Sequence, residues 1–421
     1  MARVMKRIFL VVGWAAGALI LMLTGLALSS RDRLLQFANT WQERSEGAEL
    51  ANKLVTSQDM LDYVAAHPEQ VSIASWDVGQ EDEGLFFHAE RLQPAAGALE
   101  MNVLAQYARA VAQGVQSEDE LIPVATWERY WLSQTDGGAH ISALQEARAR
   151  GVLEQDRGAI RMRDLVRALV RYGDHAAADL LLDRYARAQN VDPDVSLTTA
   201  LTPFSGMWLS WIDHVSHAPN APAAELLARY NALGSSDYAR LTWQLADRLR
   251  DDATYRTLVR ERLEQHGVGL SLKEQAQLSA AFSPRGDAHS YAQLLQQIVR
   301  SELPGSAAMR AQLEFTPTQS EFAELAVKRG SLPGVLTSVS YGRGKGEDHT
   351  RVLAVFLRQL PLAVWLHLAQ AQVLQRFEND LLLDAAFFAH AKRRLSQNEA
   401  LRSAGLGTEV EARHALTQHA H

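Results

Sequence analysis

The sequence of 421 residues contains no cysteine. This absence excludes disulfide bonds, thiolate metal sites and a cysteine nucleophile, and it fits both reducing and oxidising compartments. The 26 glycines and 12 prolines are too few for a collagen or a low-complexity chain. With a net charge of −7, the chain has no overall attraction to nucleic acid, so no nucleic-acid partner is expected. Its 47% hydrophobic residues are enough for one large globular domain or two of medium size.

Charge-free runs long enough to cross a bilayer are also scarce, and we find one, at residues 8–30. A helix of about 20 apolar residues spans the hydrocarbon core. Three basic residues precede the run, Arg3, Lys6 and Arg7. Because this pattern keeps an N-terminus cytoplasmic, we expect residues 1–30 to anchor the chain in the inner (cytoplasmic) membrane by a single pass, with the bulk periplasmic. A signal segment cleaved near Gly25-Leu26-Ala27 is the alternative.

The spacing of apolar residues predicts the order of elements in the domain from residue 31 to 395. Alternation about an acid-rich turn predicts a β-hairpin at 71–89, and alternation returns in three strands at 321–360. Helical periodicity covers the stretch between them, about 95–310, and a C-terminal helix at about 362–395. We therefore predict an α+β fold of three layers, with a five-stranded antiparallel sheet flanked by helices and an enlarged all-helical lobe. The polar tail, 396–421, is expected to be disordered.

Three local sequences occur in an informative order. Gly97 and Glu100 lie in the first turn of the helix that follows the hairpin, Gly173-Asp174-His175 joins two helices, and Lys328-Arg329-Gly330-Ser331 ends a strand that two further strands follow. Together they resemble the penicillin-recognising acyl-serine family, the class A β-lactamases and related DD-peptidases, over about residues 55–395. The resemblance implies a β-lactamase/transpeptidase-like fold. It aligns these segments with the family's Ser-x-x-Lys, Ser-Asp-Asn and Lys-Thr-Gly motifs.

The chain departs from all three motifs. In the family a serine hydroxyl attacks the substrate carbonyl, and a lysine three residues later can accept its proton. Gly97 has no nucleophile and Glu100 has no ammonium, while only Asp174 remains of Ser-Asp-Asn. No Ser-x-x-Lys occurs near residues 90–105. The resemblance therefore implies a catalytically degenerate member, with no catalytic residue assigned.

Several residues at these positions have both a functional and a structural interpretation. Lys328, Gly330 and Ser331 predict a strand edge that holds an anionic ligand, or an ordinary strand end. Glu100 is a solvated first-turn residue, or it activates a water in the space beside Gly97.

The two segments that contain His175 and His140 also have a functional and a structural interpretation. His175 beside Asp174 is an acid/base pair or a neighbour of a helix cap. The loop from Asp136 to His140 presents backbone N–H groups to a ligand, or it is a turn.

Two further features concern partners and cofactors. Trp208 and Trp211 predict a surface that contacts a partner or the membrane, with core packing as the alternative. The histidines His88, His140 and His175 lack the tight spacing of a zinc motif, so we expect no metal and no cofactor.

These features predict a membrane-anchored extracytoplasmic pseudoenzyme. It would be a non-catalytic binding or regulatory protein of the cell envelope, with a peptidoglycan peptide or a cell-wall protein as its partner. One alternative is an active enzyme of the β-lactamase or DD-peptidase type that uses a displaced serine such as Ser133, or a water activated by Glu100. The other alternative is a structural assembly protein that acts through its helical lobe.

Overall fold

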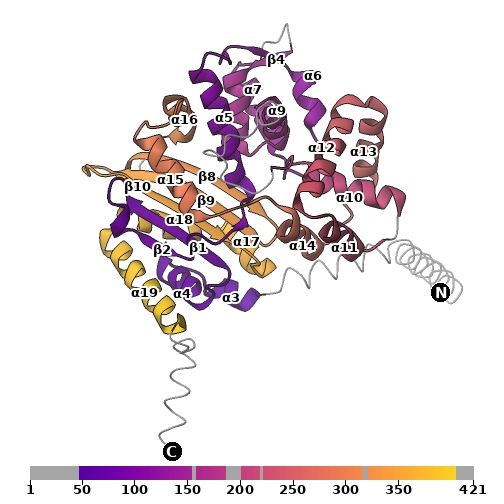
Figure 1. Cartoon of the computed structure of the whole chain (residues 1–421). Helices are drawn as coiled ribbons and strands as arrows, with labels where there is room; N and C mark the ends of the chain where they lie inside the picture. Colours follow the sequence, from indigo (N-terminus) through magenta and orange to yellow (C-terminus); the bar gives the residue numbers. More distant parts are fainter. Residues whose placement is uncertain (1–46, 154–157, 186–200, 219–220, 316–320, 404–421) are drawn as a thin grey trace, which may run out of the picture.

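The computed structural model describes residues 47–153, 158–185, 201–218, 221–315 and 321–403 (Figure 1). An antiparallel sheet of six strands lies at its centre, in the order β2-β1-β10-β9-β8-β7. The strands are β1 (Val71–Asp77), β2 (Leu85–Phe87), β7 (Glu314–Phe315), β8 (Phe322–Leu332), β9 (Val335–Gly344) and β10 (Arg351–Leu357). The predicted hairpin and the three late strands are confirmed. The predicted number of five is wrong, because β7 adds an edge strand of two residues that is too short to show alternation.

The sheet joins the two ends of the described chain. β1 pairs along its whole length with β10, from Val71 opposite Leu357 to Asp77 opposite Arg351. All seven residues of β10 are buried, since helices cover both of its faces.

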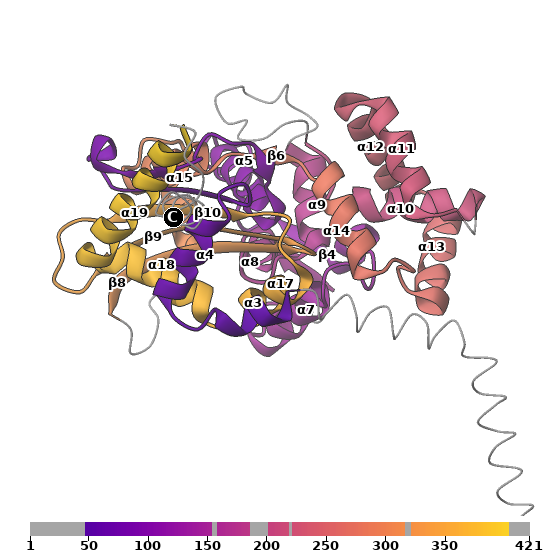
Figure 2. The same ribbon diagram turned by 90° about the horizontal axis from the view of Figure 1, so that it is seen from below.

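Two groups of helices cover the sheet and make three layers, as predicted (Figures 1 and 2). On one face lie α3 (Ala48–Lys53), α4 (Ser57–Ala66), α17 (Leu362–Gln370), α18 (Val373–Leu383) and α19 (Ala385–Ser403). Against the other face packs α15 (Ala288–Val299), with α16 (Ser306–Leu313) beside β8. The helices α5 (Glu100–Ala112), α7 (Ala139–Ala149), α8 (Met162–Tyr172) and α9 (His175–Tyr185) pack on one another and on α16, and they share one hydrophobic core with the sheet.

The C-terminal helix differs from the prediction. It is three helices, and the last extends past residue 395 to Ser403; residues 404–421 lie outside the described part. Asp384 begins the third helix, because its side chain accepts the backbone N–H groups of Ala386 and Phe387.

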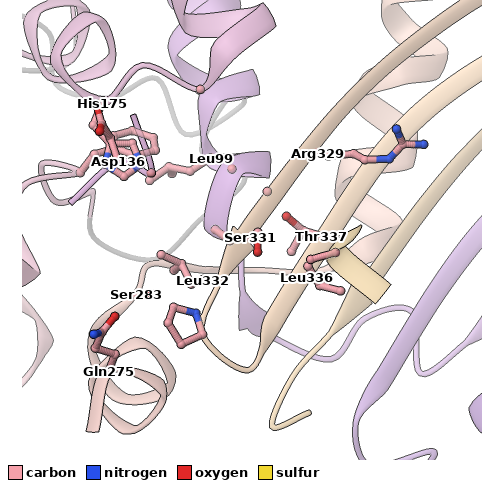
Figure 3. Close-up of a pocket in the computed structure, with 18 of the residues that line it drawn as sticks. Leu99, Asp136, His175, Gln275, Ser283, Arg329, Ser331, Leu332, Leu336 and Thr337 are labelled. Atoms are coloured by element: carbon pink, nitrogen blue, oxygen red, sulfur yellow. The ribbon is translucent and has the colours of Figure 1, made fainter. Parts of the chain in front are cut away.

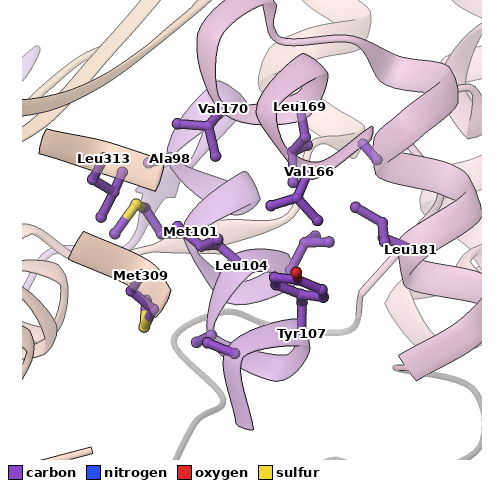
Figure 4. Packing of buried hydrophobic residues seen from close by; sticks show 14 of the residues in the cluster. Ala98, Met101, Leu104, Tyr107, Val166, Leu169, Val170, Leu181, Met309 and Leu313 are labelled. Atoms are coloured by element: carbon purple, nitrogen blue, oxygen red, sulfur yellow. The ribbon is translucent and has the colours of Figure 1, made fainter. Parts of the chain in front are cut away.

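The core between α5, α8 and α16 fixes the helix that carries Glu100 (Figure 4). Met101 and Leu104 of α5 are buried with Leu169 of α8 and with Met309 of α16. A buried leucine contributes about 1.5 to 3 kcal/mol relative to an exposed one, so this packing sets the position of the first turn of α5.

Five helices form a lobe with a hydrophobic core of its own, which the second view separates from the sheet (Figure 2). They are α10 (Gly206–His217), α11 (Ala223–Leu233), α12 (Ser235–Asp251), α13 (Ala253–His266) and α14 (Leu272–Phe282). The predicted helical stretch 95–310 therefore contains two groups of helices: α10 to α14 have this separate core, whereas α5 and α7 to α9 belong to the core that the sheet shares.

Two predictions for this region are corrected. Trp208 and Trp211 are each 5% exposed and belong to the lobe core, so they form no exposed aromatic surface on the outside of the lobe. The indole of Trp211 donates to the carbonyl of Val268. The stretch 95–310, predicted to be helical, also contains a short strand, β6 (Arg285–Gly286), which pairs with β3 (Gln93–Pro94).

The predicted membrane anchor, residues 1–30, lies outside the described residues. Among the helices of the described ranges, none combines the length and the apolar character that a bilayer crossing requires.

Candidate functional site

The backbones at Gly97 and Gly330 touch where the first turn of α5 meets β8. A Cβ atom at position 97 would lie 2.6 Å from the Cα of Gly330 and 2.7 Å from the carbonyl oxygen of Arg329. A Cβ atom at position 330 would lie 2.0 Å from the backbone nitrogen of Gly97. Such distances are far inside van der Waals contact, so neither position has room for a side chain in this backbone. The short 3-10 helix η2 (Ala96–Leu99) holds the contact, and the Thr337 hydroxyl donates to the carbonyl of Ala95 behind it.

Glu100 and Lys328 form a buried ion pair beside this contact. The Lys328 Nζ lies 2.6 Å from the Glu100 Oε2, and each side chain is 4% exposed. The same Nζ donates to the carbonyl oxygens of Leu169 and Val170, both at 3.2 Å, near the C-terminal end of α8. A cation at this end of a helix is also favoured by the helix dipole.

The pair changes the interpretation of both residues. Lys328 Nζ has a carboxylate and two carbonyl oxygens of the protein within 3.2 Å, and its side chain is 4% exposed, so it is not accessible to a ligand. The prediction that Lys328 holds an anionic ligand is therefore corrected. Burial raises the pKa of Glu100 to about 7, although the attraction of Lys328 opposes the rise. Glu100 is thus neither solvated nor a free carboxylate.

Asp174 pairs with His140 rather than with His175. Its Oδ2 lies 3.1 Å from the Nδ1 of His140, and its Oδ1 accepts the backbone N–H of Ala176 as the cap of α9. The imidazole of His140 is fully buried and stacks on Trp131 at 4.9 Å between ring centroids. The predicted Asp174–His175 pair is therefore wrong. As in the alternative interpretation, His175 is the neighbour of a helix cap, which is Asp174.

His175 instead faces a cavity (Figure 3). Its Nδ1 atom is buried without a hydrogen-bond partner within the described part of the chain, and its ring lies 5.4 Å from that of Phe204. Burial lowers the pKa of this imidazole, so His175 is neutral at pH 7.

The cavity has a volume of about 710 Å³ and lies between the sheet and the helical lobe. Its sheet side is formed by Gly97, Glu100 and residues 329–333, and its lobe side by α10, α12 and α14. The junction of α17 and α18 and the loop 134–137 complete the walls. The volume is in the range of ligand-binding clefts, about 300 to 1,000 Å³.

Some of the predicted site residues line the cavity and others do not. Gly330, Ser331 and Asp136 line it, and the Ser331 hydroxyl accepts a hydrogen bond from the indole of Trp365 at 3.0 Å. His140 and Ser133 are not among the lining residues. Asp136 accepts the backbone N–H groups of Gly138 and His140, so the predicted turn at this loop is confirmed.

Sequence reasoning missed the lobe-side wall. Asp179, buried on α9, fixes it by accepting the backbone N–H groups of Phe204 and Ser205 and the Ser205 hydroxyl. Burial raises the pKa of Asp179 to about 7. An Asp within an apolar helical run is a signal of such a partner, because buried carboxylates require hydrogen-bond donors.

No group of three or more His, Asp or Glu side chains suited to a metal ion occurs in the part of the chain that the structure describes.

Comparison with solved structures finds similarity to class A β-lactamases. The β-lactamase of Sphaerobacter thermophilus is 16% identical, with 83% of this chain and 98% of that chain covered and a TM-score of 0.40. A β-lactamase of Chitinophaga pinensis (12%; 77% and 98%; TM-score 0.39) and an ancestral class A β-lactamase (12%; 78% and 100%; TM-score 0.41) are similar to the same degree.

No protein-family model and no curated protein matches the sequence. The structural similarities are partial and carry no conclusion about activity.

Proposed function

We propose that this chain is a non-catalytic binding protein of the cell envelope, in which the cavity between the sheet and the lobe takes the ligand. Anchoring by residues 1–30, with the folded part outside the cytoplasm, belongs to the same proposal. It is supported by the charge-free run and by the basic residues before it. A peptide of the cell wall or a cell-wall protein is the partner that this location favours.

The contact between Gly97 and Gly330 carries the proposal. Acyl transfer by the route that the sequence resemblance implies requires a hydroxyl at position 97 and space in front of it for the scissile carbonyl. A Cβ atom at position 97, which the hydroxyl needs, would overlap the backbone of Gly330. A serine introduced at position 97 would displace the strand rather than attack a substrate.

Hydrolysis by a water that Glu100 activates is not favoured. A general base must reach the water that it deprotonates. Glu100 has a 4% exposed side chain and is bound to Lys328. A displaced serine is not supported either. Ser133 does not line the cavity, and the Ser331 hydroxyl is hydrogen-bonded to the indole of Trp365, which is no base.

A fluorescent penicillin tests the proposal, because it labels any acylating serine covalently. We expect no labelled band for the purified chain. The variants Ser331→Ala and Ser283→Ala, which remove the two hydroxyls of cavity-lining serines, serve as the matched set. A band that disappears in one of them would identify a nucleophile and would defeat the proposal.

The double variant Gly97→Ser/Glu100→Lys sharpens the same test. It restores the family's residue types, but it places a second ammonium against Lys328 and a side chain against Gly330. We expect it to be unlabelled and destabilised.

A further inference from the structure

Few charged side chains line the cavity, and most of them already bind other groups of the protein. Four of the lining residues are acids or bases: Glu100, Asp136, His175 and Arg329. Glu100 is paired with Lys328, and both oxygens of Asp136 accept backbone N–H groups. His175 is neutral at pH 7 because its imidazole is buried. Arg329 is the one cationic side chain among the described residues that line the cavity.

Arg329 is itself committed to a buried partner. Its Nη2 donates to the Oε2 of Glu378 at 2.6 Å, and its Nε reaches the same oxygen at 3.3 Å. Glu378 is 1% exposed and Arg329 is 44% exposed, so the buried carboxylate offsets the charge that the guanidinium presents at the wall. A ligand carboxylate that drew Arg329 away would leave Glu378 buried without its cation. The remaining formal charge on the wall, that of Asp136, repels anions.

The polar part of the wall consists of amides and hydroxyls. Five glutamines line the cavity: Gln134, Gln275, Gln370, Gln372 and Gln375. The amide nitrogens of Gln134 and Gln275 donate to the carbonyls of Leu263 and Leu270, which fixes these two side chains at the wall. Gln370, Gln372 and Gln375 are exposed at the junction of α17 and α18. Each amide can donate and accept at once, which is the complement of a peptide bond.

The rest of the wall is apolar. Six separate elements and loops contribute to it through Leu99, Phe204, Trp208, Leu272, Leu332 and Trp365. Mostly apolar walls with a few placed polar groups are typical of sites that enclose a ligand.

We propose that the cavity binds an uncharged peptide segment with apolar side chains and discriminates against carboxylate-bearing ligands. The inference rests on the proposed binding function and names its ligand class. It also differs from the anion-binding strand edge that the sequence predicted, since Lys328 is turned away into the protein.

A pair of peptides that differ in one group tests this ligand class. The full chain is titrated with N-acetyl-Leu-Gln-Leu amide and with the same peptide as its free acid, and binding is followed by calorimetry and by the fluorescence of the wall tryptophans. We expect the amide to bind. The affinity of the acid should be lower by a factor of about ten or more, and a factor of ten corresponds to about 1.4 kcal/mol. Equal or tighter binding of the acid, or no binding of the amide at millimolar concentration, would overturn the proposal.

Two variants with matched controls place the binding in the cavity. Ala369 lines the cavity at an exposed position, so the indole of Ala369→Trp would occupy part of the cavity and should abolish binding. Ala112→Trp, at an exposed position on α5 away from the cavity, should not affect binding. Gln375→Lys adds a cation to the wall and should narrow or reverse the preference for the amide, whereas Gln113→Lys should leave it unchanged. Binding that survives Ala369→Trp would contradict the assignment.

The outcomes separate this inference from the proposed function. Covalent labelling by penicillin would defeat the non-catalytic function. If the amide peptide does not bind, or binds no more tightly than the acid, the proposed ligand class is wrong, but the proposed non-catalytic function is not contradicted.

Discussion

The junction around Lys328 and the cavity beside it share the first turn of α5 but differ in how their polar groups are used. At the junction, Lys328 and Glu100 satisfy each other and the end of α8 at 4% exposure. In the cavity, amides and hydroxyls line about 710 Å³ of space. The comparison teaches that acidic and basic residues of the types used in catalysis can bind each other inside the protein, while the cavity next to them stays open.

The largest effect is expected from breaking the buried pair. Lys328→Met should destabilise the protein by about 3 to 5 kcal/mol, because it leaves Glu100 buried without its cation. The double variant Glu100→Leu/Lys328→Met should recover most of this loss, since it removes both buried charges. Urea unfolding of the single and double variants measures the difference. A double variant as unstable as Lys328→Met would mean that the pair is not the source of the effect.

A smaller loss is expected where the backbones touch. Gly330→Ala should cost about 1 to 3 kcal/mol, because the methyl group overpacks against the nitrogen of Gly97. Gly346→Ala is the control for the loss of a glycine alone, since a Cβ there meets nothing within 4 Å, although its φ of +82° adds local strain. Wild-type stability of Gly330→Ala would show that the contact is looser than described.

The cavity wall should show a pH dependence of known sign. The pKa of Asp179 is about 7 in the folded protein and about 3.8 when unfolded, so its contribution to stability is complete below pH 4 and is lost as the pH rises to 7. The stability of Asp179→Asn relative to wild type should therefore increase between pH 4.5 and 7.5. Glu261→Gln, an exposed acid on α13, is the control. A parallel pH profile for wild type and Asp179→Asn would refute the assignment.

The smallest effect is expected within the cavity itself. Gln375→Ala should change the free energy of unfolding by no more than about 0.5 kcal/mol, because Gln375 is exposed. It should nevertheless weaken binding of the neutral peptide. A large loss of stability would show that Gln375 supports the fold and is not available to a ligand.

The sequence predicts the sheet well where apolar and polar residues alternate regularly along a strand. Alternating apolar residues identify β1 and the three late strands. Gly97, predicted in the first turn of the helix after the hairpin, lies instead in the 3-10 helix η2 that leads into α5. The break before α19 could also have been found, since Asp384 interrupts an apolar run with a side chain that caps helices. The strand β7 has only two residues and carries no detectable period.

The candidate site is harder to predict, because its geometry depends on tertiary contacts. Alternation along β8 places Lys328 on the same face as the buried Ala326, which indicates an inward side chain. That its partner is Glu100, more than 200 residues earlier, follows only from the packing of α5 against the sheet. The cavity is assembled from segments between residues 96 and 375, none of which has a pattern that points to the others.

The pairing of β1 with β10 has a consequence for synthesis. A strand at residues 71–77 finds its long partner at 351–357, so about 270 residues must be made before the centre of the sheet can close. Until then β1 has only the three residues of β2 beside it, and one row of its backbone groups is open to other chains. Contacts this distant in sequence form slowly, and a nascent or truncated chain that ends before residue 351 should aggregate rather than fold.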